Sequence, residues 1–514
     1  MSFFPIPDLS EFFTNLADDI KEDIHSKLPE RKAAALSRLR ELLPLTFDFD
    51  YIKFAIIPAL LTSPYKGERL SLPMIDLPLT KENALPYYFW GLLYDDWEPN
   101  KEEDGLSVFI QGYENRGDNN LRKRIYASAL TPDLYRSMYG DKVVQFFDQL
   151  FDAQNAEKPL MHQYLDHYFD LFWNLHLDVK PAAIPAEVRE IGMSFNTVLA
   201  YRDPTQEIVY TNYMKVRSLR QFLKEWIDAR VEDVIRGRVE NPEKTFVYYW
   251  IQNGEEKEDF RRKDVVFECF HNFVALSQWG NTLYNFMSKL SKDTGDTNVQ
   301  AWFEKTMNSD DEQVNNSPST RLDWFVMELF RTISPNTGSI SAIEEVRTPP
   351  YNRHGYVISP HKATSEDPHH WQDATQFNPE RYNNVPTSNQ IDEVKSQAIG
   401  FAQCPFHKTS FEVKDGRNAA ITNSAFGTVY SINNDEASPV YDYAGYAPFG
   451  FGYRRCPGEL LTVEVFKEFF RKVWKDKIEF GKLNLPNAEK LPIGPTTVIE
   501  DNIGFKKLMS DTSM

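Results

Sequence analysis

The segment Ala447-Pro-Phe-Gly-Phe-Gly-Tyr-Arg-Arg-Cys456-Pro-Gly-Glu459 carries the most information about the fold of this chain. Its glycines, Gly450, Gly452 and Gly458, allow the backbone to turn tightly and to approach a flat ligand closely. Cys456 stands at the expected start of a helix, where the positive end of the helix dipole stabilises a thiolate. A cysteine held in this way is suited to bind a metal ion.

The composition argues against several classes of protein. The chain has 514 residues, of which 14% are aromatic, and these rings can line a large core or a deep apolar pocket. The formal net charge of -18 repels nucleic acid and anionic membranes, so neither is expected as a partner. The three cysteines, Cys269, Cys404 and Cys456, are too few for a disulfide framework and fit a reducing compartment.

The N-terminal sequence predicts neither a signal peptide nor a membrane span. It lacks the basic n-region and the long apolar core of a secretory signal. The longest early apolar run, residues 54–61, contains Pro58 and is far shorter than the ~20 residues that a membrane span needs. We therefore expect a soluble, cytoplasmic protein without a transmembrane anchor, and peripheral membrane contact stays open.

Helical patterns dominate most of the chain. Residues 131–133 (Thr-Pro-Asp) predict a helix start, and the residues that follow are apolar at intervals of three and four. Residues 28–43 and 213–236 are further helical stretches. Residues 264–290 are apolar on nearly all sides, which predicts a helix in the interior of a large protein. A final helix is expected over residues 457–474.

The residues after Pro335 have a different composition from the helical stretches before them. Pro, Asn and His residues alternate with short extended pieces, which predicts strands and irregular backbone. Residues 383–443 are polar with little periodicity, and a loop of that length in a compact domain is typical of an insertion. The chain shows no internal repeat and no low-complexity block.

The cysteine segment resembles the haem-binding loop of cytochromes P-450, Phe-x-x-Gly-x-Arg-x-Cys-x-Gly. All five fixed positions match, at Phe449, Gly452, Arg454, Cys456 and Gly458. The resemblance implies that Cys456 is the proximal ligand to the iron of haem b. It also implies that Phe449 packs on the thiolate side and that Arg454 reaches a haem propionate. A thiolate ligand favours O–O cleavage at haem iron.

Two further segments resemble family motifs and occur in the family's order. Glu328-Leu-Phe-Arg331 matches Glu-x-x-Arg, and residues 367–371 and 377–382 match Asp-Pro-x-x-Trp and Phe-x-Pro-Glu-Arg-Phe with Tyr382 at the last position. The resemblance implies that Glu328, Arg331 and Arg381 form one buried ion network behind the haem. Paired Arg and carboxylate groups fix geometry even where they add little net stability.

The resemblance places the distal, oxygen-binding face in the helix over residues 264–290. Monooxygenases of the family carry an acid–Thr pair there, which relays protons; Thr282 takes the Thr position and Asn281 replaces the acid. Asn holds a water molecule but cannot deliver a proton. Arg122 and Arg124 fit the place of a helix that binds haem propionates, although the family's preceding aromatic residue is absent.

The resemblance implies a single domain over residues 1–514 with a mostly α fold, in which haem lies between a large helical part and a small β-rich subdomain. The first implied function is a monooxygenase that oxidises a small, largely apolar organic substrate with dioxygen and electrons from a reductase or ferredoxin. The alternative is a reductase-independent isomerase or dehydratase acting on a fatty-acid hydroperoxide, similar to allene oxide synthase or prostacyclin synthase, and Asn281 favours it. A haem-binding protein without turnover is a third class that no feature favours.

The last helix and its flank carry basic residues near the expected proximal face. These are Lys467, Arg471, Lys472, Lys475 and Lys477. A local basic patch steers an acidic electron-donor protein even when the whole surface is acidic. Glu464 and Glu468 lie in the same helix, so a merely solvated face is the alternative interpretation.

Overall fold

A computed structural model gives the structure of much of this chain. It describes residues 75–77, 121–201, 207–254, 262–309, 320–333, 339–346, 353–359, 365–366, 371–384, 419–423, 428–433, 436–439, 448–449, 456, 458–494 and 497–508. The helix predicted over residues 28–43 lies outside these residues. Residues 121–124 are described as helical backbone only.

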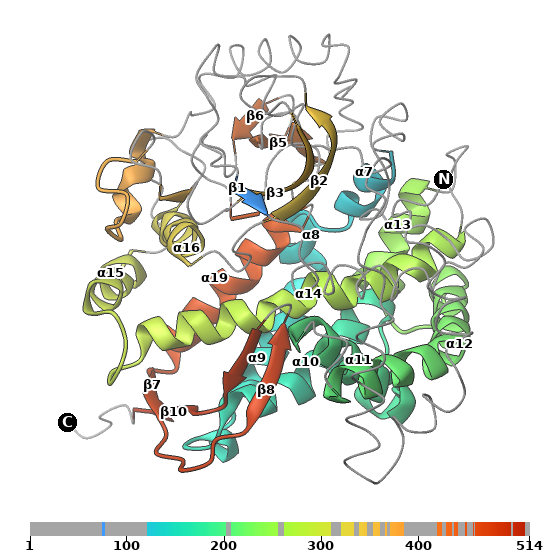
Figure 1. The fold of residues 1–514 in the computed structure, drawn as a ribbon, viewed down its shortest axis with the longest axis horizontal. Helices are drawn as coiled ribbons and strands as arrows, with labels where there is room; N and C mark the ends of the chain where they lie inside the picture. Colours follow the sequence, from blue (N-terminus) through green and yellow to red (C-terminus); the bar gives the residue numbers. More distant parts are fainter. Residues whose placement is uncertain are drawn as a thin grey trace.

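Helices make up most of the described structure (Figure 1). They are α7 (Leu121–Ser128), α8 (Pro132–Leu134), α9 (Gly140–Leu150), α10 (Leu160–Leu177), α11 (Ala186–Tyr201), α12 (Glu207–Ile235), α13 (Phe246–Gly254), α14 (Arg262–Leu290), α15 (Thr297–Met307), α16 (Arg321–Thr332) and α19 (Glu459–Lys475). The elements α12, α14 and α19 confirm the helices predicted over residues 213–236, 264–290 and 457–474. The mostly α fold class is confirmed as well.

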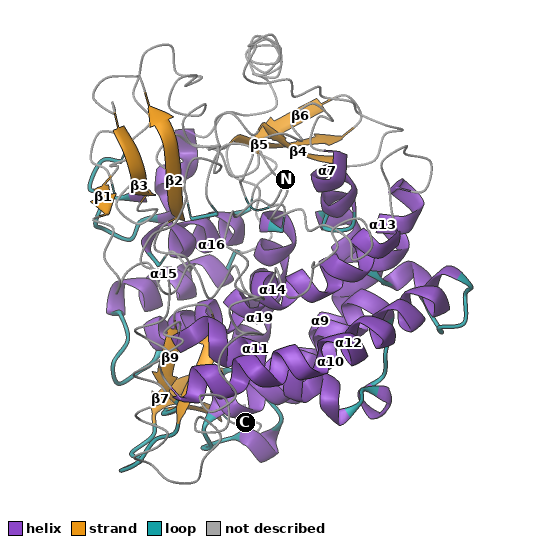
Figure 2. Cartoon of the chain, turned by 45° about the vertical axis from the view of Figure 1, so that its right-hand side comes forward, coloured by secondary structure: helices purple, strands orange, loops and turns teal. Residues whose placement is uncertain are grey.

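The strands of the described residues form small antiparallel sheets. One sheet has the order β1-β3-β2, from β1 (Ile75–Leu77), β2 (Ser339–Val346) and β3 (Arg353–Ser359). A second contains β4 (Ala419–Asn423), β5 (Thr428–Asn433) and β6 (Glu436–Pro439). Two sheets of two strands each pair β7 (Ile478–Lys482) with β10 (Ile503–Lys507) and β8 (Lys490–Gly494) with β9 (Thr497–Glu500). Figures 1 and 2 place the first two sheets on the opposite side of α14 from α10 and α11.

Side-chain caps define where two functionally important helical segments begin. Thr131 accepts a hydrogen bond from the backbone N–H of Leu134 at 3.3 Å, which confirms the predicted start. The segment then passes through a π-helical turn, Tyr135–Tyr139, into α9. Thr320 and Asp323 form a reciprocal capping box at the start of α16. The capping box fixes the register of the helix that carries Glu328 and Arg331.

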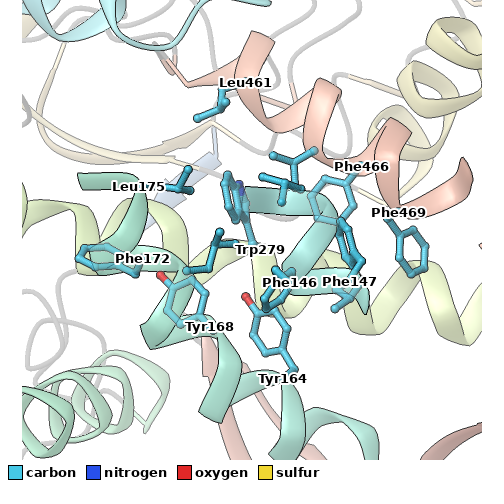
Figure 3. Close-up of a cluster of buried hydrophobic side chains, with 14 of the residues drawn as sticks. Phe146, Phe147, Tyr164, Tyr168, Phe172, Leu175, Trp279, Leu461, Phe466 and Phe469 are labelled. Carbon is cyan, nitrogen blue, oxygen red and sulfur yellow. The ribbon is translucent and has the colours of Figure 1, made fainter. Parts of the chain in front are cut away.

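The hydrophobic core lies where α9, α10, α14 and α19 pack together (Figure 3). Its buried rings include Phe146, Phe147, Tyr164, Tyr168, Phe172, Trp279, Phe466 and Phe469. Burying one large apolar side chain stabilises a fold by roughly 1.5–3 kcal/mol. Phe286 of α14 contacts Phe466 of α19 with 5.0 Å between ring centroids. The core therefore fixes the distance between the long central helix and the helix that follows Cys456.

The prediction of an irregular loop over residues 383–443 is wrong where β4, β5 and β6 lie. The β5 sequence, Thr-Val-Tyr-Ser-Ile-Asn, is rich in β-branched and aromatic residues, which favour strands. Its short length and polar flanks hid that preference, and pairing with β4 and β6 supplies the partners that a single short strand lacks. The interpretation of this region as an insertion, and of the chain as a single domain, stays a prediction.

Membrane insertion of a helix finds no support in the described part of the chain. None of the helices there combines the length and the hydropathy that a membrane crossing requires.

Candidate functional site

Cys456 is held by backbone contacts immediately before α19. Its backbone N–H donates a hydrogen bond to the carbonyl oxygen of Phe449 at 2.9 Å. The Phe449 ring packs on Phe330 of α16, with centroids 4.8 Å apart. Cys456 is half-buried, and no disulfide joins it to another described residue. The thiol group thus stands at the N-terminal end of α19, where the helix dipole favours its ionised form.

Gly458 lies beside the sulfur atom at the N-cap of α19. Its φ of -88° is available to any residue, and an added Cβ would lie 3.7 Å from Cys456 Sγ and 3.9 Å from Leu130 Cδ1. Those are ordinary van der Waals distances, so neither strain nor the protein's own packing requires glycine at this position. A missing methyl group beside a cysteine sulfur leaves room for a flat ligand such as haem, and the cysteine donor set fits that group.

Glu328 stands at the centre of the predicted ion network. Glu328 and Arg331 are both 0% exposed, and Arg331 donates to the two carboxylate oxygens at 2.7 and 2.8 Å. Arg381 Nε donates to Glu328 Oε1 at 2.9 Å. The structure therefore brings together the three residues that the sequence placed in one network.

The segment over residues 371–382 satisfies the rest of this network. Arg331 Nη1 donates to the carbonyl oxygen of Ala374 at 2.6 Å, and the Asn378 N–H and the Tyr382 hydroxyl donate to Glu328 at 2.8 and 3.1 Å. The Trp371 ring lies 5.5 Å from the Arg331 guanidinium carbon. Attraction to the Glu328 carboxylate outweighs burial and raises the pKa of Arg331. The network joins α16 rigidly to the chain that follows it.

The predicted distal residues lie in the C-terminal half of α14. Thr282 is buried, and its hydroxyl donates to the carbonyl oxygen of Gln278 at 3.0 Å. The Asn281 amide oxygen accepts from Asn285 Nδ2 at 2.7 Å, and a Cβ added at Gly494 of β8 would lie 3.6 Å from Asn281 Cβ. These contacts place Asn281 where α14 meets β8. Roles for Thr282 and Asn281 in oxygen chemistry stay predictions.

Helix α14 also contacts α19 directly. Trp279 Nε1 donates to Thr462 Oγ1 at 3.1 Å, and both side chains are buried. A Cβ added at Gly280 would lie 2.4 Å from the carbonyl oxygen of Ile493, so the backbones of α14 and β8 meet closely at this glycine. The central helix is thus fixed on two sides at neighbouring residues.

Some of the predicted site residues have no side-chain description here. Gly452 and Arg454 lie outside the described residues, and so do the side chains of Arg122 and Arg124 in α7. Their assignment to haem propionates stays a prediction.

The prediction of an exposed basic patch on α19 is wrong for Lys467 and Lys472. Lys467 is buried and pairs with Asp323 at 2.8 Å and Glu464 at 3.1 Å. Burial works against charge on Asp323, but attraction to Lys467 outweighs it and lowers the pKa of that carboxyl. Lys472 pairs with Asp476 at 2.9 Å and with Asp148. Their positive charges are largely balanced within the protein, because each lysine pairs with one acidic side chain of α19 or its C-cap and with one from another helix.

Solved structures show what this arrangement of helices is similar to. A cyanobacterial CYP120A1 with bound retinoic acid matches with a TM-score of 0.50 and 15% identity, over 75% of this chain and 78% of that one. A zebra fish cytochrome P-450 matches with a TM-score of 0.51 in its structure with progesterone and 0.52 in its structure with abiraterone. Both zebra fish structures are 13% identical and cover 88% of this chain, and the match covers 99% and 100% of theirs.

The chain has the cytochrome P-450 fold. No protein-family model and no curated protein matches the sequence. Within this fold Cys456 stands at the N-terminal end of α19 with a glycine beside its sulfur, and its role as an iron ligand stays a prediction.

A buried polar chain that joins α7, α14 and α10 had no sequence prediction. Tyr126 of α7 donates to the amide oxygen of Asn272 of α14, and Asn272 Nδ2 lies 2.8 Å from His176 Nε2 of α10. Polar residues within apolar helices, such as Asn272 and His176, were the available signal. A sequence does not show which of them meet, because they are far apart along the chain.

Proposed function

We propose that this protein is a haem-thiolate monooxygenase that oxidises a small, largely apolar organic substrate. The observation that carries the proposal is the position of Cys456 in a cytochrome P-450 fold, tied to Phe449 by a 2.9 Å hydrogen bond at the N-terminus of α19. The network of Glu328, Arg331 and Arg381 supports it, because it makes rigid the side of the site against which Phe449 packs.

The residues of this chain would hold haem and its surroundings in a defined geometry. Bound haem with a thiolate ligand supplies dioxygen activation driven by electrons from a partner protein. Cys456 would bind the iron, and the carbonyl of Phe449 orients its backbone. Arg454 with Arg122 or Arg124 would bind the propionates as charge-assisted donors. Thr282, whose hydroxyl donates to Gln278 in the structure, would order water on the distal side.

The substrate class is inferred from the apolar surroundings and from similar structures. Rings of Phe, Tyr and Trp line the core from α10 through α14 to α19. The similar structures hold retinoic acid, progesterone or abiraterone, each built on an extended hydrocarbon skeleton. A pocket bounded by such residues gains affinity mainly from the burial of apolar surface. Dioxygen is the proposed second substrate.

A peroxide-rearranging isomerase or dehydratase is the alternative, and it depends on Asn281. Such an enzyme takes its oxygen from a fatty-acid hydroperoxide and needs neither an external electron nor a proton. In the structure the Asn281 amide oxygen accepts from Asn285 at 2.7 Å, so part of its capacity is used within α14. We therefore place the monooxygenase first, with a reductase or ferredoxin as electron donor.

Turnover of a lipid hydroperoxide, with and without a reductase and reduced nicotinamide, separates the two functions. If the protein is a monooxygenase, an apolar organic substrate should give product only when a reductase, reduced nicotinamide and dioxygen are present. The product should then contain one oxygen atom from labelled dioxygen. Rapid conversion of the hydroperoxide without electrons, and no product in the reductase assay, would establish the alternative. A Cys456→Ser variant serves as the control for haem-dependent chemistry in both assays.

A further inference from the structure

A chain of buried hydrogen bonds joins α7, α14 and α10. The Tyr126 hydroxyl donates to Asn272 Oδ1, Asn272 Nδ2 lies 2.8 Å from His176 Nε2, and His176 Nδ1 lies 2.7 Å from the carbonyl oxygen of Phe172. Tyr126, Asn272 and His176 are 7%, 1% and 0% exposed. We call these three residues the Tyr–Asn–His chain.

The protons of this chain have one consistent arrangement. A carbonyl oxygen only accepts, so His176 Nδ1 must carry a proton and donate a hydrogen bond to the Phe172 carbonyl oxygen. Burial lowers the pKa of His176 to about 3, so the ring is neutral and its Nε2 accepts from the Asn272 amide N–H. The Asn272 oxygen then faces Tyr126, which must donate. Every member is therefore matched, and no member can be replaced by an apolar residue alone without leaving a buried polar atom unpaired.

Tyr126 is fixed by more than its hydroxyl group. Its carbonyl oxygen accepts from Trp250 Nε1 of α13 at 3.1 Å, and the two rings stack with centroids 5.1 Å apart. Helix α7 is only eight residues long, so contacts made by this one residue define a large part of its position. An isolated helix of that length has little stability of its own.

The residues that follow α7 in the chain lie close to Gly458, the glycine beside the Cys456 sulfur. Leu130, two residues after the end of α7, is buried, and its Cδ1 lies 3.9 Å from the position of a Cβ at Gly458. Burial raises the pKa of the Tyr126 hydroxyl, so this group stays protonated and donates to Asn272. Helix α7 also carries Arg122 and Arg124, the residues assigned to the haem propionates.

We propose that Tyr126, Asn272 and His176 are positioning residues that hold α7 against the haem site and so control how tightly haem is retained. This inference rests on the proposed function, because it assumes that Cys456 binds haem iron. Asn272 of α14 and His176 of α10 would then affect haem retention through the position of α7 and not through contact with the haem.

The experiment compares the holoproteins of Tyr126→Phe and Asn272→Leu with wild type. Two quantities are measured: the rate of haem transfer to excess apomyoglobin, and the fraction of the carbon monoxide complex that shows the red-shifted thiolate Soret band. We expect haem release to be faster by about tenfold, the factor that corresponds to ~1.4 kcal/mol. We also expect a smaller thiolate fraction in both variants.

Tyr139→Phe is the matched control. Tyr139 is 0% exposed and also contacts α13, with 5.1 Å between the centroids of its ring and that of Phe246, but its hydroxyl has no hydrogen-bond partner among the described residues. Removing that oxygen should leave both measurements within about twofold of wild type, because no hydrogen bond is lost.

The double variant Tyr126→Phe/Asn272→Leu separates positioning from general stability. It removes the hydroxyl group that Asn272→Leu leaves unpaired on Tyr126, so its melting temperature should rise above that of Asn272→Leu, in which His176 Nε2 has lost its donor as well. Haem release should remain fast, because α7 still lacks its tie to α14. Recovery of haem retention together with the melting temperature, or release within twofold of Tyr139→Phe in the single variants, would overturn the proposal. A wild-type protein without any thiolate Soret band would instead refute the proposed function.

Discussion

Replacement of Glu328 by Ala tests whether the ion network supports the cysteine loop. The structure gives Glu328 five donors, from Arg331 twice and from Arg381, Asn378 and Tyr382 once each. Removing the carboxylate leaves the fully buried guanidinium of Arg331 without its counter-charge. Breaking a buried pair in this way costs about 3–5 kcal/mol, a large share of the ~5–15 kcal/mol that stabilises a typical protein.

Asp133→Ala provides a matched comparison for this variant. Asp133 and Arg136 form an i,i+3 pair of the same 2.7 Å length, but their side chains are 53% and 57% exposed. Loss of an exposed pair costs no more than about 1 kcal/mol. Soluble yield, haem content and the urea midpoint of the holoprotein should therefore fall sharply for Glu328→Ala and change little for Asp133→Ala. Equal urea midpoints and full haem content in both variants would refute the reasoning.

Further predictions concern the central helix and its neighbours. Burial lowers the pKa of His176 to about 3 from its ordinary 6.5, so the unfolded chain binds one proton more between those values, and stability falls as pH falls through that window. His176→Gln should reduce the slope of the unfolding free energy against pH, between pH 4 and 6, by up to ~1.4 kcal/mol per pH unit. An unchanged slope would contradict this. Gly280→Ala should lower the melting temperature markedly, because its Cβ would meet the Ile493 carbonyl at 2.4 Å; an unchanged melting temperature would mean that α14 and β8 do not meet there. If the protein activates dioxygen, Thr282→Ala should consume nicotinamide and release peroxide while product falls, and full coupling of nicotinamide use to product would remove Thr282 from the proton path.

The sequence predicted the parts of the site that depend on local spacing. Cys456 is close in sequence to its glycines, and Glu328 is close to Arg331. A motif therefore identifies each of these two groups without knowledge of the fold. The same is true of helices such as α14, whose apolar character on nearly all sides extends over many turns. These predictions needed only short-range information.

Contacts between distant segments could not be predicted from the sequence. Tyr126, Asn272 and His176 meet because α7, α14 and α10 pack together, and nothing in each local sequence indicates a partner. Lys467 looked like a surface charge on an amphipathic helix, but Asp323 of α16 lies against it and both are buried. The paired strands β4 to β6 were missed for the same reason, because strand preference depends on neighbouring strands.

The carbon monoxide difference spectrum of the reduced protein tests the central claim most directly. Wild type should show the red-shifted Soret band of a thiolate-bound haem, and Cys456→Ser should lose that band. Cys269→Ala, which changes a fully buried cysteine of α14, should keep it. A thiolate band that persists in Cys456→Ser, or one that is lost in Cys269→Ala with Cys456 intact, would contradict the assignment of Cys456 as the iron ligand.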